Sequence, residues 1–302
     1  MARSRKRISL EQRRRYAGLL FILPFIIGFA VFILQPVIMT VVYSLHEMVI
    51  ETGGGYALRP LGGGAFSHYV NAFTKDAEFP QLLVGTLRNI AYQTPIIVAF
   101  SLFMAIVLSQ PFRGRLAARA VFFLPIIVTS GVIINIIKMG LRDVAMGDGT
   151  QSNLFNSYFL YEILVNLDIP DNITDTAMQI VNGIVDLVWR SGVQILIFIA
   201  GLLAIPKSHY EVAQVEGATG WETFVKVTFP SIAPHMVLAL IYTVIDYSAS
   251  YENETLLYIS DVSYTQASYS YGSALSIVYF IITVGVVSLL YFLLNRKIHY
   301  ET

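Results

Sequence analysis

The sequence predicts an all-α polytopic membrane protein with six transmembrane helices and a cytoplasmic helical hairpin between the fourth and the fifth. The 302 residues are 55% apolar and only 13% charged. Several uncharged runs reach the roughly 20 residues that a helix needs to cross a bilayer. A polar stretch at 205–230 lies between such runs and carries helix-capping signals instead of the Gly and Ser of a linker.

The first two spans are predicted at 17–45 and 85–109. Residues 1–16 hold seven Lys or Arg and one Glu, so they form a basic N-terminus. The apolar run after them is longer than the ~7–15 residues of a signal-peptide core and lacks an Ala-x-Ala site, so it is predicted to be retained. Residues 46–83 contain two Gly triplets, neither followed by Lys-Ser/Thr, and are predicted to be a flexible loop, not a phosphate-binding loop.

The other four spans are predicted at 120–137, 178–203, 234–258 and 271–295, and residues 296–302 form a C-terminal tail. The stretch 141–176 is acid-rich, with room for a small surface helix. Fourteen of the twenty Lys and Arg residues lie in the N-terminus, the 110–119 loop, the 205–230 segment and the C-terminus. Because basic residues concentrate on the cytoplasmic side, both termini and the 205–230 segment are predicted to be cytoplasmic.

The 205–230 segment reads as helix, tight turn, helix. Ser208 and Glu211 have the spacing of a capping box, with Ser208 as the N-cap. Gly217 can end that helix at positive φ. Thr219 and Glu222 repeat the capping pattern, and Pro230 and Pro234 are predicted to close this helix-turn-helix unit. A rigid capped hairpin is typical of a docking surface; an ordinary amphipathic loop helix is the alternative.

Catalytic patterns are missing from the sequence. No His-x-x-x-His, paired carboxylates or Gly-x-Ser-x-Gly appear, and the absence of Cys excludes disulfides, thiolate metal sites and catalytic thiols. No catalytic, metal-binding or cofactor-binding residue is therefore predicted. Transport is the function class that remains. Since the chain has no nucleotide-binding loop, a membrane subunit driven by a separate motor is one economical account.

Charged and polar residues within the spans need partners or water, because each charge costs at least ~2.5–3.5 kcal/mol at span depth. Asp186 and Arg190 are four residues apart and face each other on a helix. They form either a stabilising ion pair or a contact on the pathway or with a partner. In residues 243–258, Asp246, Ser250 and Asn253 share one helical face beside Tyr247, Tyr251 and Glu254. Asp246, Tyr247, Tyr251 and Asn253 are candidates for lining a pathway for a hydroxyl-rich solute; a polar seam between helices is the alternative.

Glu211-Val212-Ala213-x-x-Glu216-Gly217-Ala218, followed by Phe224 and Pro230, resembles the EAA motif of ATP-binding-cassette (ABC) importer permeases. Trp189-x-x-Gly192, Ala200-Gly201-Leu202 and Ile205-Pro206-Lys207 resemble the carbohydrate-uptake branch. The run 19–45 and Tyr271 to Ser276 are similar to the first-encoded permease of maltose and glycerol-phosphate systems. Val212 and Glu216 depart mildly from the motif, and residues 253–272 replace the family's Thr-Gly-Gly-Gly-Pro turn.

This resemblance implies a permease subunit in a bacterial or archaeal cytoplasmic membrane that imports a sugar, oligosaccharide or glycoside. The implied partners are a second homologous permease, two ABC ATPase subunits, an extracytoplasmic solute-binding protein and the lipid bilayer, with no nucleic acid. ATP and Mg²⁺ are implied to bind the partner ATPase, and no cofactor binds this chain. The residues implied to couple the permease to the ATPase are Glu211, Ala213, Glu216, Gly217, Ala218, Phe224 and Pro230.

Two other functions compete with this reading. One is an ion-coupled secondary transporter with Asp246 or Asp186 as its coupling site, which internal inverted repeats would favour. No such repeat is evident in the sequence. The other is a non-transporting membrane scaffold in which the 205–230 hairpin only binds a partner.

Overall fold

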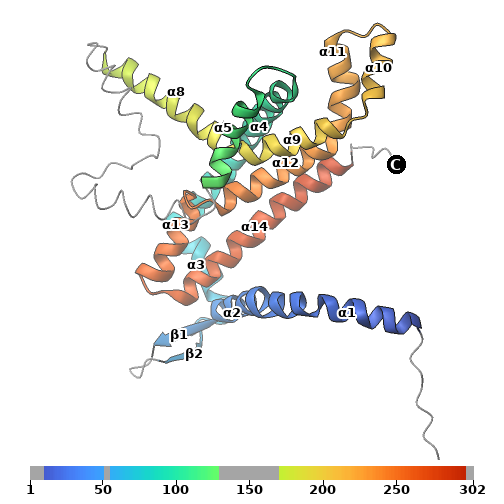
Figure 1. Cartoon of the computed structure of the whole chain (residues 1–302). Helices are drawn as coiled ribbons and strands as arrows, with labels where there is room; N and C mark the ends of the chain where they lie inside the picture. The colour runs from blue at the N-terminus through green and yellow to red at the C-terminus, as the bar shows by residue number, and fades with distance from the viewer. Residues whose placement is uncertain (1–9, 51–54, 129–169, 297–302) are drawn as a thin grey trace, which may run out of the picture. The chain divides into compact units, whose positions relative to one another are not determined.

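The computed structural model describes residues 10–50, 55–128 and 170–296 of the chain. These fall into two compact units. Unit 1 consists of Met1–Leu87 and Ala249–Gly285, and unit 2 of Arg88–Ser248 and Val286–Thr302. Figure 1 labels the main helices and strands of the two units.

Unit 1 begins with one long apolar helical run, α1 (Leu10–Phe29), the π-helix η1 (Ala30–Leu34) and α2 (Gln35–Ser44). From Leu20 to Ser44 this run is long and apolar enough to cross a membrane. Pro36 follows η1 by two residues and has no N–H to donate, so a regular ladder cannot continue there. The wider π-turn, in which the Gln35 N–H bonds to the Ala30 carbonyl, precedes this interruption.

The prediction that residues 46–83 form a flexible loop is wrong for the residues of this stretch that the structure describes. Strand β1 (His46–Ile50) pairs with β2 (Tyr56–Pro60) as an antiparallel hairpin, with Met48 opposite Leu58. Helix α3 (Ser67–Thr74) follows, and α4 (Glu78–Ser109) starts before the predicted residue 85. The Met48 N–H donates to Ser270 Oγ at 2.8 Å, a partner more than 200 residues away that local sequence does not reveal.

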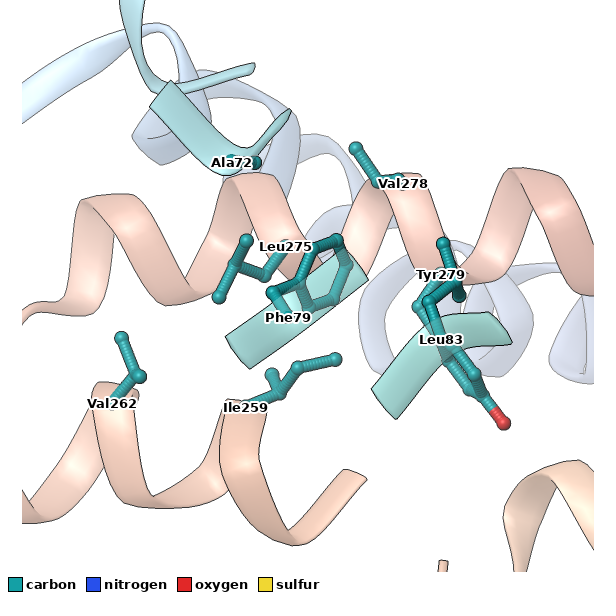
Figure 2. Packing of buried hydrophobic residues seen from close by; sticks show 8 residues of the cluster. All are labelled: Ala72, Phe79, Leu83, Ile259, Val262, Leu275, Val278 and Tyr279. Atoms are coloured by element: carbon teal, nitrogen blue, oxygen red, sulfur yellow. The ribbon is translucent and has the colours of Figure 1, made fainter. Parts of the chain in front are cut away.

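The core of unit 1 is a cluster of buried side chains from α3, α4, α13 (Glu254–Ser260), the π-helix η3 (Asp261–Thr265) and α14 (Tyr269–Asn295). Figure 2 shows Phe79 of α4 between Leu275 of α14 and Ile259 of α13. Phe79 and Leu275 are fully buried. Residues 253–272, which depart from the family's turn, therefore form ordered helical structure packed into this core.

Unit 2 contains the rest of α4, α5 (Arg115–Val128), α8 (Asp171–Arg190), α9 (Gly192–Ala204) and α12 (Phe229–Ala249). Its core joins α4, α9 and α12 through Val98, Ala105, Leu108, Ile195, Phe198, Ile199 and Ala239. Gly201 permits close packing here, because a Cβ on it would lie 2.7 Å from Cγ of His235. Arg119 of α5 donates from Nη2 to the Leu108 carbonyl at 2.9 Å, which satisfies the end of α4.

The predicted fourth span is a bent pair of helices. α8 and α9 meet at Ser191 with an angle of 53°. A Ser-Gly pair at 191 and 192 is a common cause of such a kink. The described residues contain four helices that are long and apolar enough to span a membrane, or five if the bent pair is one span. Residues 129–137 of the predicted third span, and the acidic stretch up to 169, lie outside the described residues.

Candidate functional site

The hairpin at 205–230 begins with α10 (Lys207–Val215), but Ser208 does not cap it. Pro206 is the N-cap residue, with an extended backbone at ψ 135° and no side-chain cap. Its carbonyl accepts the His209 N–H at 3.1 Å, so the first turn begins two residues before the predicted N-cap. The predicted first capping box is therefore wrong, because Ser208 lies inside the helix.

The end of α10 is a Schellman motif. Gly217 has φ +74°, as its place in the sequence predicts. Its N–H donates to the Gln214 carbonyl at 3.1 Å, and the Ala218 N–H donates to the Ala213 carbonyl at 2.9 Å. A Cβ on Gly217 would meet no atom within 4 Å, so the backbone angle, and not space, is what favours glycine here.

The second helix of the hairpin, α11 (Gly220–Thr223), starts with the predicted capping box. Thr219 Oγ1 accepts the Glu222 N–H at 3.3 Å, and Glu222 accepts the Thr219 N–H at 2.9 Å. The prediction that Pro230 and Pro234 close the helix-turn-helix unit is wrong. A π-helix, η2 (Phe224–Thr228), leads directly into α12, which contains both prolines. As at Pro36, the π-turn precedes the residue without an N–H, so the helical path continues.

The hairpin presents apolar side chains on a well-bonded backbone. Val212, Val215 and Trp221 are 56%, 90% and 72% exposed. Ala213 is buried, and the Tyr210 and Thr228 hydroxyls, 3.3 Å apart, tie α10 to η2. Phe224 lies in an aromatic row between Trp221 and Phe229, with centroid distances of 5.7 and 6.2 Å. Glu211, Glu216 and Gly217 are exposed, and Ala218 is half-buried.

Unit 2 also brings the polar residues of the fourth and fifth predicted spans together. Arg190 Nε donates to Asp186 Oδ1 at 2.8 Å, and its guanidinium lies 5.5 Å from the centroid of the Tyr247 ring. Tyr242 donates its hydroxyl to Asp246 Oδ1 at 3.5 Å, a weak bond. Asp186 and Arg190 on α8 thus join Asp246 and Tyr247 on α12 in one cluster of two carboxylates, a cation and an aromatic ring, which we call the Arg190 cluster.

Tyr251 and Asn253 do not continue this helix face. α12 ends at Ala249, before the predicted residue 258, and Asn253 is the N-cap of α13 in unit 1. Asn253 is buried: its Oδ1 accepts the Thr255 N–H at 3.0 Å, and its Nδ2 donates to the Tyr279 hydroxyl at 3.0 Å. The prediction that Asp246, Ser250 and Asn253 share one helical face is therefore wrong. Asn is a favoured N-cap residue, so Asn253 favours the start of a new helix over continuation of α12. Tyr251 is exposed and donates to Glu252 at 2.8 Å.

A buried polar pair beside the Arg190 cluster was not predicted. Gln194 Nε2 of α9 donates to Thr243 Oγ1 of α12 at 3.0 Å, and Thr243 donates to the Ala239 carbonyl at 2.7 Å. Both side chains are buried, and Gln194 Oε1 has no hydrogen-bond partner. The sequence held one signal for this pair. Gln194 follows Arg190 by four residues, and Thr243 precedes Tyr247 by four residues, so each polar residue is spaced about one helical turn from a member of the Arg190 cluster.

The chain resembles transport proteins along nearly its whole length. It is 27% identical to a probable ABC transporter permease, YesP, of Bacillus subtilis, over 95% of this chain and 93% of that one. It is 28% identical to the lactose transport system permease LacF of Rhizobium radiobacter, over 96% and 98%. The trehalose/maltose permease MalF of Thermococcus litoralis is 27% identical over 91% and 92%. The chain is a homologue of sugar ABC transporter permeases.

Solved structures agree on the fold of this permease homologue. One chain of a bacterial alginate ABC transporter, crystallised with a periplasmic protein that holds an alginate pentasaccharide, superposes with a TM-score of 0.65 at 16% identity. The match covers 97% of this chain and 98% of that one. A second alginate importer structure gives a TM-score of 0.61 at 17% identity. No protein-family model matches the permease homologue.

Proposed function

We propose that this chain is a membrane subunit of a binding-protein-dependent ABC importer and forms half of its solute pathway. A second homologous permease would complete the pathway, and two ATPase subunits would bind ATP and Mg²⁺. The α10–α11 hairpin carries this proposal, because it combines exposed apolar side chains with a backbone held by a Schellman motif and a capping box.

The hairpin suits a part that transmits force. Val212, Val215 and Trp221 offer apolar area to a cleft of the ATPase, and Glu211 and Glu216 offer charge beside it. Ala213, Gly217 and Ala218 hold the turn that sets the angle between the helices. Phe224 and Pro230 lie on the continuous helical path into α12, so displacement of the hairpin would move that helix.

Coupling requires the hairpin to bind the ATPase with unequal free energies in its open and closed states, since only a differential affinity shifts a conformational equilibrium. ATP binding would close the ATPase dimer and displace the hairpin. The caps of the hairpin support this proposal: a frayed hairpin would absorb the displacement, whereas a hydrogen-bonded turn would pass it to η2 and α12.

For the solute, we propose a sugar, oligosaccharide or glycoside that passes the Arg190 cluster. Carboxylates accept hydrogen bonds from sugar hydroxyls, the guanidinium donates them, and an aromatic ring packs on C–H faces. Asp246 and Tyr247 are the residues of this chain that we assign to the pathway. Tyr251 and Asn253 lie in unit 1, where Tyr251 remains a candidate lining residue and Asn253 would act through the helix it caps.

The test is co-purification of the ATPase with the native chain and with a Val215→Asp variant. Val215 is 90% exposed, so an acid there leaves the fold intact while it places a charge in the proposed apolar contact. We expect at least a tenfold loss of ATPase association, which corresponds to about 1.4 kcal/mol. Phe66→Asp is the matched control, because Phe66 is also an exposed apolar residue but lies in unit 1.

The proposal fails if the native chain purifies without an ATPase and shows uptake that depends on protons or sodium. That result would favour an ion-coupled transporter, and Asp246 would be the residue to substitute next. If the ATPase is retained, sugars can be screened for stimulation of ATP hydrolysis with the binding protein present. Tyr247→Ala should then weaken stimulation more than Tyr247→Phe, which keeps the ring.

A further inference from the structure

His68 is an unusual residue in unit 1. It lies on α3, and its Nε2 atom is buried without a hydrogen-bond partner. Its ring packs against the ring of Tyr271 on α14, with centroids 5.8 Å apart and an interplanar angle of 52°. Buried polar atoms are nearly always bonded, so an unpaired one calls for a physical reason.

Tyr271 connects His68 to a carboxylate. The Tyr271 hydroxyl donates to Asp76 Oδ2 at 2.7 Å, and the Tyr258 hydroxyl of α13 donates to the same oxygen at 2.9 Å. Asp76 Oδ1 accepts the N–H groups of Glu78 and Phe79 at 3.0 Å each, at the start of α4. We call His68, Asp76, Tyr258 and Tyr271 the His68 cluster. It links α3, the start of α4, α13 and α14, and its Tyr258 and Tyr271 pack against the buried core shown in Figure 2.

The surroundings of His68 favour its neutral form. Burial lowers the pKa of His68, and the Glu47 carboxylate on β1 offsets part of that effect. Glu78 and Asp261 are the other carboxylates that act on the cluster, both through Tyr258. A protonated imidazole would carry a second N–H into a position that offers Nε2 no acceptor, so the charged ring would have to leave its place.

We propose that the His68 cluster is a proton-operated latch. The neutral ring keeps α3 packed on α13 and α14, and protonation of His68 releases α3 from the core. The latch goes beyond the transport function and does not depend on which solute is carried. Because the folded state binds this proton less readily than the unfolded chain, the latch weakens as pH falls through the ordinary range of histidine near 6.5.

The natural chain has no Cys, so single cysteines report cleanly on this motion. Ala72→Cys places a thiol on the buried face of α3, where Ala72 has no exposed surface, and Val70→Cys places one on its 57% exposed face. The measurement is the rate of modification by a membrane-impermeant thiol reagent, as the ratio of position 72 to position 70. The ratio removes the pH dependence of the thiol itself.

We expect the ratio to rise several-fold between about pH 7.5 and pH 5.5, the range in which histidine titrates. In the His68→Phe variant, which keeps the ring contact with Tyr271 but cannot titrate, the ratio should stay flat. A ratio that does not rise in the natural chain, or that rises equally in His68→Phe, would overturn the proposal.

A second variant covers the case in which His68→Phe folds poorly. Glu47→Gln removes the carboxylate that favours protonation but leaves His68 in place, and Glu47 is exposed. In this variant the pH at which the modification ratio rises should be lower than in the natural chain. An unchanged midpoint pH would contradict the latch. Failure of the ABC importer proposal would leave these ratios unaffected, because they are measured without ATPase or solute.

Discussion

At the scale of single residues, two polar side chains of this permease homologue, Asn253 and Asp76, each connect several elements. Asn253 caps α13, and it also bonds to Tyr279 of α14 and to Thr86 of α4, whose Oγ1 donates to Asn253 Oδ1 at 3.4 Å. Asp76 does the same at the start of α4. Capping is what these residue types favour, but their long-range partners, Tyr279 and Thr86 for Asn253 and Tyr258 and Tyr271 for Asp76, do not follow from residue type.

Asp76→Asn should remove stability that depends on its charge. Burial alone would raise the pKa of Asp76, but hydrogen bonds from the Phe79 N–H, the Tyr271 and Tyr258 hydroxyls and the Glu78 N–H lower it below its ordinary value. The folded state therefore gains stability above an ordinary carboxyl pKa near 3.9 and loses it as pH falls through the lowered value.

We expect the variant to lose about 1.5–3 kcal/mol of unfolding free energy at neutral pH, as for hydrogen bonds to a charged group. The difference should shrink below about pH 4. The measurement is denaturant unfolding in detergent, in the His68→Phe background, which removes the titration of His68 from the comparison. Asp261→Asn, at an exposed carboxylate bonded to Gln266 Nε2 at 3.0 Å, is the control. An equal loss from both variants, or one that persists at low pH, would contradict this role for Asp76.

At the scale of elements, helix ends and interruptions decide where the side chains of unit 2 lie. The break at Ser191 turns α9 by 53° from α8. Arg190 and Gln194 thus lie on different helices, yet both meet α12, at Tyr247 and Thr243 respectively. The hydrogen bond between Gln194 and Thr243 adds a polar contact to the apolar packing of α9 on α12.

Thr243→Val should destabilise the protein by about 1–3 kcal/mol, because it leaves the buried Gln194 Nε2 without an acceptor. Gln194→Met combined with Thr243→Val should cost less than Thr243→Val alone, since both polar groups are then gone and volume is kept. Thr40→Val is the matched control: Thr40 also donates to a carbonyl four residues earlier, at 2.9 Å, but on an exposed helix. Simple additivity of the two substitutions would argue against the pair.

At the scale of the whole molecule, the location of the charges predicts which ends face the cytoplasm. Single cysteines at Val215 of the hairpin and Leu116 of α5, both highly exposed, should react only with reagent applied from the cytoplasmic side of sealed vesicles. A cysteine at Phe66, near β2 and α3, should react only from the opposite side. Labelling of all three from one side would overturn the predicted topology.

Sequence alone determined the features that depend on short stretches of chain. Apolar runs predict the long helices because burial in lipid depends on composition. The positive φ of Gly217 and the capping box at Thr219 are local in the same sense.

Tertiary structure decided the features whose partners are distant in sequence. The β1–β2 hairpin is tied to Ser270, and Asn253 ends the predicted fifth span by capping a helix that packs on α4 and α14. The helical path through Pro230 depends on a π-turn that residue preferences do not reveal. At Ser270 and Asn253 a contact across the chain outweighs a local preference of about 1 kcal/mol, so only the folded molecule shows which one prevails.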